Sequence, residues 1–341
     1  MIFYFLIMVL VFGVLIFIHE FGHFITARAN GVSVKEFAIG MGPTIFSWQG
    51  KKHDTKYGLR LLPIGGFVSM TGEDEESDDP SAFCNKSVPR RMVIVIAGAV
   101  MNLLLGFALM VILVFSQGNL ASNVIGRFDE TAISAEKLSV GDEIVKVGRV
   151  RVHTWEETVY EIMSQGYEPV DMTVIRNGEK ITVEDVTFGT MEDSGAIFGN
   201  CDFIPFAEER TAGNLLRHSF YRSASTVKMV YDSIIGMVTG RFGIEAVSGP
   251  VGVAEVVGDA AKASMQQFLY IVAVLSINLG VFNLIPFPAL DGGRFLFLIV
   301  EGIRRKPINR NVEAYVNFVG LMLLFALMIF ITCKDILKLI F

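Results

Sequence analysis

The first 29 residues constrain the fold of this chain more than any other part of it. Residues 1–18 carry no charged side chain, and the apolar pattern continues to Ala29. A helix needs about 20 mainly apolar residues to cross a bilayer, so we expect a first transmembrane helix over residues 1–29. A cleaved signal peptide is the alternative, but no basic residues precede the run. The 341 residues are 52% hydrophobic and only 19% charged, which is typical of a membrane protein with a modest soluble portion.

This first segment contains three titratable residues, in the pattern His19-Glu20-Phe21-Gly22-His23. Residues four apart lie on one face of a helix, one turn above the other, so the two imidazoles can share one Zn²⁺. Glu20 then lies beside the metal and can take a proton from a bound water. The five-residue pattern also arises by chance in soluble chains. Inside a membrane, however, titratable groups are costly, and their presence indicates a functional site.

The segments that follow give the predicted order of spans and connections. Residues 30–91 are polar with strand-like pieces. Within them, residues 59–70 predict a membrane-associated β-hairpin that bends at Gly65-Gly66, and an acidic loop follows. Residues 207–262 have the pattern of amphipathic and juxtamembrane helices, with basic residues suited to a membrane surface. The remaining apolar segments predict spans over residues 92–117, 263–291 and 315–341, with a basic loop at residues 292–314.

Residues 118–206 have the composition of a water-exposed domain, with short alternating runs and more acidic than basic residues. Asn177-Gly178 predicts a tight hairpin turn, and Thr154 is the predicted cap of a helix between strands. We therefore expect one small α+β domain inserted between the second and third spans. The predicted fold class is an α-helical polytopic membrane protein with four transmembrane helices, a membrane-associated β-hairpin and this insert.

The second span contains Gly98 and Asn102, which are four residues apart and so share one helical face. A small residue and an amide on one face favour close helix packing and an interhelical hydrogen bond. The other interpretation is that they contribute to the active site.

A catalytic zinc takes three protein ligands and keeps one position open for water, so a third ligand is needed. His53, His153 and His218 have suitable chemistry but lie in polar segments, where a solvated histidine is usual. Asp291 ends the third span among proline and glycine residues, which unwind the backbone and let a carboxylate turn inward. The three cysteines are isolated, so thiolate ligands are not predicted.

The depth of these residues in the membrane supports Asp291. If the N-terminus lies outside, His19 is about 27 Å and Asp291 about 36 Å from the outer ends of their spans, at about 1.5 Å per residue. Both groups then fall near the inner side and can meet. Most of the basic residues in the loops, such as Arg90, Arg91, Arg304 and Arg305, fall on the same side, as the positive-inside rule requires.

Four elements in this order, HEFGH, the Gly-Gly hairpin, the soluble insert and NLIPFPALDGG, resemble the site-2 protease family of intramembrane zinc metalloproteases, peptidase family M50. The closest likeness is to its bacterial regulator-of-sigma-E protease branch. The resemblance implies His19, His23 and Asp291 as zinc ligands and Glu20 as the catalytic base. It also implies a hairpin that pairs with substrate as an added strand. The substrate-binding residues that it implies are Leu62, Gly65, Gly66, Phe67, Asn278, Asn283, Pro286 and Pro288.

The insert resembles a single PDZ domain, because Ser139-Val140-Gly141-Asp142-Glu143-Ile144 matches the usual turn and strand. Val124-Ile125-Gly126 matches the carboxylate-binding loop poorly, and Ala99 stands where the family often has proline. The domain can therefore either bind a substrate C-terminus or act as a size filter. The resemblance implies a multi-pass protein of the bacterial inner membrane, with the PDZ-like domain extracytoplasmic and the active site near the cytoplasmic side.

The function that these features predict is intramembrane zinc-dependent proteolysis of single-span membrane proteins, within regulated intramembrane proteolysis. An anti-sigma factor and remnant signal peptides are the substrates that the resemblance implies. The lipid bilayer is a further partner, and the net charge of −6 gives no indication of nucleic-acid binding. A zinc transporter or sensor, or a membrane adaptor with a vestigial metal site, are the alternatives. Glu20 argues against both, because neither needs a base beside the metal.

Overall fold

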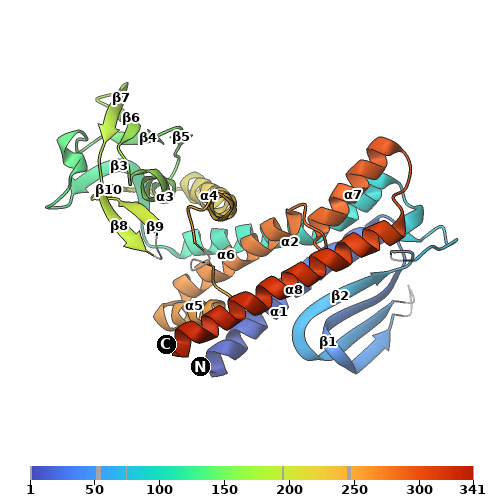
Figure 1. Ribbon diagram of the computed structural model, residues 1–341. Coiled ribbons are helices and arrows are strands. Elements are labelled where there is room, and N and C mark those ends of the chain that lie inside the picture. Colours follow the sequence, from blue (N-terminus) through green and yellow to red (C-terminus); the bar gives the residue numbers. More distant parts are fainter. Residues whose placement is uncertain (1, 51–54, 74, 194–195, 244–246, 341) are drawn as a thin grey trace. The chain divides into compact units, whose positions relative to one another are not determined.

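The computed structural model describes residues 2–50, 55–73, 75–193, 196–243 and 247–340. The chain forms two compact units, one built from Met1–Leu109 and Ser248–Phe341 and the other from Met110–Val247 (Figure 1). The first unit is called the membrane unit below, and the second the β unit.

Four helices of the described chain are long and apolar enough to cross a membrane. They are α1 (Ile2–Ala29), α2 (Val88–Ser116), α6 (Met265–Leu284) and α8 (Arg310–Ile340). The prediction of a polytopic membrane protein with four spans is confirmed. Two shorter helices, α5 (Pro250–Ala263) and α7 (Asp291–Arg304), also belong to the membrane unit.

Helix α6 ends at Leu284, before the end of the span predicted to reach residue 291. Proline disfavours a helical conformation in the residue before it, and Pro286 and Pro288 follow directly. The chain then turns and re-enters a helix at Asp291, the first residue of α7. Asp291 is therefore placed by a turn rather than by the end of a continuous span.

Small residues bring α1, α2 and α6 close together. A Cβ at Gly22 of α1 would lie 2.5 Å from the carbonyl oxygen of Ala97 on α2. A Cβ at Gly280 of α6 would lie 2.9 Å from the carbonyl oxygen of Ala99. Ser276 Oγ also donates a 2.8 Å hydrogen bond to the Asn102 carbonyl. In a lipid environment such close backbone contacts and interhelical hydrogen bonds are what hold helices together.

The hairpin region forms a larger sheet than the sequence predicts, from β1 (Val34–Gln49) and β2 (Lys56–Met70). Residues 34–39 pair with residues 66–70 on one side and with residues 56–59 on the other, so β2 folds back around the segment that contains Gly65. No further described strand pairs with residues 66–70, which therefore form an edge. This sheet packs against α1 in the membrane unit (Figure 1).

The β unit is built on a sheet with the strand order β10-β3-β4-β6-β7, and β5 pairs with β4. Asn177 and Gly178 both have positive φ in the two-residue turn between β6 and β7, as their sequence predicts. Thr154 caps α3 by accepting a hydrogen bond from the Glu157 amide, as also predicted. The bounds are β3 (Leu120–Phe128), β4 (Glu143–Val147), β5 (Val150–Arg151), β6 (Val170–Arg176), β7 (Glu179–Val186), β8 (Gly189–Asp193), β9 (Ala196–Asn200), β10 (Phe203–Glu208), α3 (Trp155–Gln165) and α4 (Ala212–Val238).

Helix α4 uses its basic residues within the β unit. Arg217 pairs with Glu208 at 2.6 Å, and Lys228 pairs with Glu161 of α3 at 2.8 Å. These contacts engage side chains that the sequence pattern assigned to a membrane surface. The polar face of α4 therefore holds this helix to α3 and to the end of β10.

Candidate metal centre

Helix α1 presents His19 and His23 on one face, as the spacing of four predicts. Their Nε2 atoms lie 3.1 Å apart, and the two rings meet edge to face. Both side chains are largely buried, with 10% and 12% of their surface exposed. Two imidazole nitrogens this close together inside a protein can both contact the same ligand.

Asp291 approaches the histidines from the turn that follows α6. Its Oδ2 atom lies 3.1 Å from His19 Nε2 and 3.3 Å from His23 Nε2. The turn packs tightly, because a Cβ at Gly292 would lie 2.2 Å from the Ile285 carbonyl oxygen. Glycine is therefore required next to Asp291 for α7 to begin so close to the end of α6.

The three converging atoms fit a metal ion. His23 Nδ1 lies 2.9 Å from the Ile94 carbonyl oxygen, which can only accept, so Nδ1 carries a proton and Nε2 of the neutral imidazole has a lone pair for a metal. Asp291 Oδ2 is buried and accepts no hydrogen bond. Three ligand atoms about 2.1 Å from one tetrahedral zinc stand about 3.4 Å apart, close to the separations observed. A cation at this point would satisfy lone pairs that otherwise face one another.

Helix α2 closes the site with the two residues whose role the sequence left open. A Cβ at Gly98 would lie 2.4 Å from His23 Nε2 and 2.7 Å from His19 Nε2, so only glycine leaves room for both rings. Asn102 is fully buried, and its amide lies 3.3 Å from His19 Nδ1. Both residues therefore pack against the histidines as well as against neighbouring helices.

Glu20 lies beside this cluster, next to the edge of the sheet. A Cβ at Gly66 would lie 3.4 Å from Glu20 Cγ, and the Val68 backbone hydrogen-bonds with the Glu20 carboxylate. His19, His23 and Asp291 are its titratable neighbours. The carboxylate thus lies between the converging ligand atoms and the sheet edge at residues 66–70.

The other residues considered from the sequence lie in α6 and the turn after it, in β2, or in the β unit. Asn283 Nδ2 donates to the Leu279 carbonyl within its own helix, and Pro288 packs on α8. The predicted residues of the sheet, Leu62, Gly65, Gly66 and Phe67, all lie in β2. His153 pairs with Glu157 and His218 with Glu208, both in the β unit. His53 lies outside the described residues.

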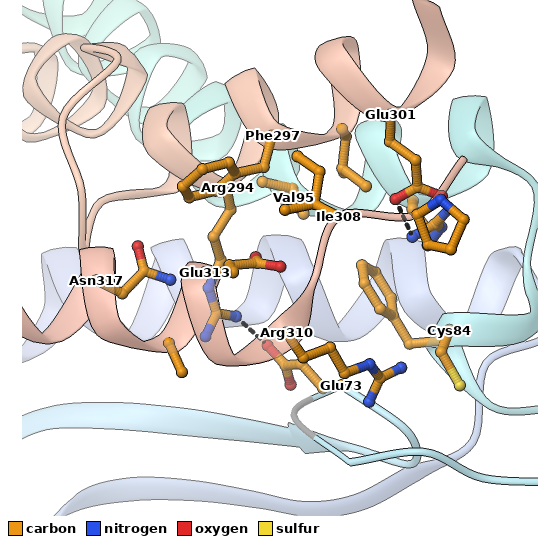
Figure 2. A pocket seen from close by; sticks show the side chains of 15 residues that line it. Glu73, Cys84, Val95, Arg294, Phe297, Glu301, Ile308, Arg310, Glu313 and Asn317 are labelled. Carbon is orange, nitrogen blue, oxygen red and sulfur yellow. Dashed lines mark hydrogen bonds and ion pairs between the residues drawn. The ribbon is translucent and has the colours of Figure 1, made fainter. Parts of the chain in front are cut away.

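Two residues beside Asp291 were not singled out from the sequence. A cavity of about 390 Å³ is lined by Asp291, Arg294 and Asn317, among others. Arg294 and Asn317 also line a second pocket, shown in Figure 2, where Arg294 pairs with Glu73. Asn317 could have been noticed, because an amide at the start of an apolar span indicates a specific contact.

Comparison with known proteins places the chain in one family. The sequence model described as peptidase family M50 matches residues 7–327. A protein of Clostridium acetobutylicum is 39% identical over 331 residues, which cover 96% of each chain. Zinc metalloprotease RasP of Shouchella clausii is 31% identical, covering 96% of this chain and 97% of its own. Regulator of sigma-W protease RasP of Bacillus subtilis is 30% identical, covering 97% of each.

Proposed function

The chain belongs to peptidase family M50 and is a zinc metalloprotease of the site-2 protease family, and from this premise we propose that His19, His23 and Asp291 are its zinc ligands. The observation that carries the proposal is the convergence of two Nε2 atoms and one carboxylate oxygen within 3.3 Å. Three protein ligands leave one position for water, which is the arrangement of a catalytic zinc rather than a structural one.

Glu20 is the general base of the proposed mechanism. Bound zinc would lower the pKa of a water so that it can lose a proton at neutral pH, and it would polarise the peptide carbonyl. Glu20 accepts the proton of the attacking water and then delivers it to the leaving amine. The Val68 backbone holds the carboxylate beside the sheet edge, so the base faces the side from which an extended substrate would approach.

The substrate is a transmembrane segment of a single-span membrane protein. A helix in lipid satisfies its amides internally, so the substrate must unwind before its carbonyl can be attacked. Residues 66–70 offer an unpaired edge next to Glu20, where an extended segment can add as a further strand. Gly65, Gly66 and Phe67 would then shape the binding strand together with Leu62. Asn278, Asn283, Pro286 and Pro288 are proposed to contact substrate from α6 and the turn.

The protein is a multi-pass membrane protein, and its orientation belongs to the proposal. The basic residues near the ends of the spans favour an active site near the cytoplasmic side of a bacterial inner membrane. The β unit, proposed to be PDZ-like, then lies outside the cytoplasm and either binds substrate or excludes bulky ectodomains. Anti-sigma factors and remnant signal peptides are the proposed physiological substrates.

Zinc content and cleavage of a model single-span substrate test the site, with the wild type compared to Glu20→Gln and Asp291→Ala. We expect Glu20→Gln to keep zinc and to lose about 10²–10⁴-fold in cleavage rate, the usual contribution of a general base. Asp291→Ala should lose both zinc affinity and cleavage. Glu255→Gln, at an exposed carboxylate of α5, is the matched control and should change neither.

Two outcomes would contradict the proposal. A fully active Glu20→Gln enzyme would remove the base from the mechanism. Unchanged zinc affinity in Asp291→Ala would show that the third ligand is another residue.

A further inference from the structure

The turn that presents Asp291 contains a strained residue. Ala289 has a φ of 73°, in the left-handed region that non-glycine residues rarely occupy. Such a conformation persists only where the surrounding structure enforces it. Because Ala289 lies two residues before Asp291, whatever enforces its backbone also fixes the start of α7.

The turn itself provides hydrogen-bond acceptors for the amides of Phe287 and Leu290, but not for the amide of Ala289. The Phe287 amide donates to the Ile285 carbonyl at 2.7 Å, and the Leu290 amide donates to the Phe287 carbonyl at 3.2 Å. The Ala289 amide instead donates to Oδ1 of Asn317, on α8, at 3.1 Å. An N–H without a partner is costly in a lipid environment, so this side chain meets a requirement that the turn itself does not meet.

Helix α8 touches the same turn one helical turn further along. A Cβ at Gly320 would lie 2.5 Å from Pro288 Cβ and 2.7 Å from the Pro288 carbonyl oxygen. Residues three apart lie on one helical face, so Asn317 and Gly320 together hold the two residues before Leu290. Figure 2 shows Asn317 on α8 at the pocket that Arg294 of α7 also lines.

This contact stands out because α8 is the least buried of the four candidate spans. At its other end Asp335 accepts hydrogen bonds from the Gly249 and Gly252 amides at 2.9 and 3.0 Å. A polar side chain in a sparsely packed span is costly unless it has a specific partner. The Asn317 amide has such a partner in the backbone that leads into Asp291.

We propose that Asn317 is a positioning residue for Asp291, through which α8 sets the affinity of the metal site. The inference depends on the proposed zinc ligands. Asn317 does not touch the ligand atoms, but it fixes the backbone that aims the Asp291 carboxylate. Loss of the Ala289–Asn317 hydrogen bond should therefore weaken metal binding and leave the chemistry of the loaded site nearly unchanged.

The test is the dissociation constant for Zn²⁺ of the full-length protein, measured by competition with a chelator. We expect Asn317→Ala to weaken zinc binding about tenfold or more, as the loss of a group that orients a ligand does. Asn317→Asp keeps an acceptor oxygen at the same place and should restore the affinity. Asn311→Ala removes an exposed asparagine from the same helix and is the matched control.

Kinetics and melting separate positioning from general damage. For Asn317→Ala, kcat should fall at limiting zinc and recover at saturating zinc, with the KM for substrate unchanged. The rise in melting temperature on adding zinc should shrink, in addition to any loss of metal-free stability caused by the unpaired Ala289 amide. In Gly320→Ala the added methyl group would clash with Pro288. This variant should therefore weaken zinc binding without removing the Asn317 side chain that bonds the Ala289 amide.

Asp291→Ala serves as the reference that keeps the two proposals distinct. If it weakens zinc binding and both α8 variants bind zinc like the wild type, the role of Asn317 is refuted and the ligand assignment stands. If Asp291→Ala binds zinc normally, the ligand assignment itself has failed. A loss of metal-free stability in Asn317→Ala without a change in zinc affinity would reduce Asn317 to a structural residue.

Discussion

At the scale of single residues, Gly98 shows how little space the candidate metal centre leaves on the side of α2. Glycine in a helix interior is less favourable than alanine by about 1 kcal/mol, so its presence requires a reason. The reason is geometric, because a Cβ there would lie within 2.7 Å of both ring nitrogens that face Asp291. The two histidine rings can therefore occupy these positions only if residue 98 is glycine.

We expect Gly98→Ala to lose zinc and proteolysis although alanine favours the helix. The added methyl group would displace one imidazole. Loss of a group that only orients a ligand costs about 10–100-fold in metal affinity, so displacing the ligand itself should cost at least as much. Zinc titration of the purified protein measures this. Gly302→Ala on α7 is the control, because its Cβ would meet its nearest neighbour at an ordinary 3.5 Å. Tight zinc binding by Gly98→Ala would show that the rings lie elsewhere.

At the scale of elements, Glu73 links the edge of the sheet to the helix that begins with Asp291. Its Oε2 accepts a 3.4 Å hydrogen bond from the amide of Met70, the last residue of β2. Its Oε1 pairs with Arg294, one turn after Asp291 on α7. The strand proposed to bind substrate and the helix that carries the proposed third ligand are therefore joined by one carboxylate.

A double-mutant cycle measures this link through kcat/KM. Glu73→Gln and Arg294→Gln should each reduce cleavage several-fold, and the double variant should lose little more than either one. Because Arg294 is 38% exposed, the coupling energy should be modest, about 0.5–1 kcal/mol. Zinc affinity should be retained by Glu73→Gln. Strictly additive losses would mean that the two side chains act separately.

The elements that sequence reasoning predicted are those specified by local pattern. The His19/His23 pair follows from helical spacing, and the four spans follow from hydropathy. Asp291 was predicted as a ligand partly because of its proline and glycine neighbours. These neighbours do form a turn, although α6 ends earlier than predicted. Each of these features depends on residues close together in the chain.

What could not be predicted depends on residues far apart. Residues 34–39 lie at the centre of the membrane-unit sheet only because two separate parts of β2 fold onto them. The basic residues of α4 have a membrane-surface pattern, but their partners on α3 are more than 50 positions away and cannot be inferred from spacing. Gly98 and Asn102 left two interpretations open, and only the three-dimensional structure reveals that both residues contact His19.

At the scale of the whole molecule, the two units hold their buried charges in different ways. In the membrane unit His19, His23 and Asp291 converge on one candidate metal centre, whereas in the β unit buried charges such as Glu161 and His218 pair with side chains of neighbouring elements. His218 is the clearest case, with its side chain 3% exposed and its Nε2 atom 2.7 Å from Glu208 Oε2. Its Nδ1 atom lies 3.8 Å from Glu156 of α3, which Arg222 also contacts.

This arrangement makes the stability of the β unit depend on pH. Burial lowers the pKa of His218, but the nearby Glu156 carboxylate and the hydrogen bond with Glu208 outweigh it, and the net pKa lies above the ordinary value of 6.5. A raised pKa in the folded state stabilises folding fully below about pH 6.5, and this stabilisation is lost as pH rises through the folded pKa. The pKa of Glu156 is lowered despite burial, mainly by His218 and then by Arg222, so its contribution is lost on acidification.

We therefore expect His218→Gln to destabilise the β unit most near about pH 6 and progressively less as pH rises past the folded pKa. Amide hydrogen exchange of the full-length protein, followed in α4 at several pH values after correction for intrinsic exchange, measures this locally. Helix α6 provides an internal reference, because it contains no carboxylate and no histidine. His153→Gln is the matched control, at a histidine whose side chain is 40% exposed. A loss of stability that is the same at every pH would show that folding does not raise the pKa of His218, and hence that Glu208 and Glu156 do not hold its proton.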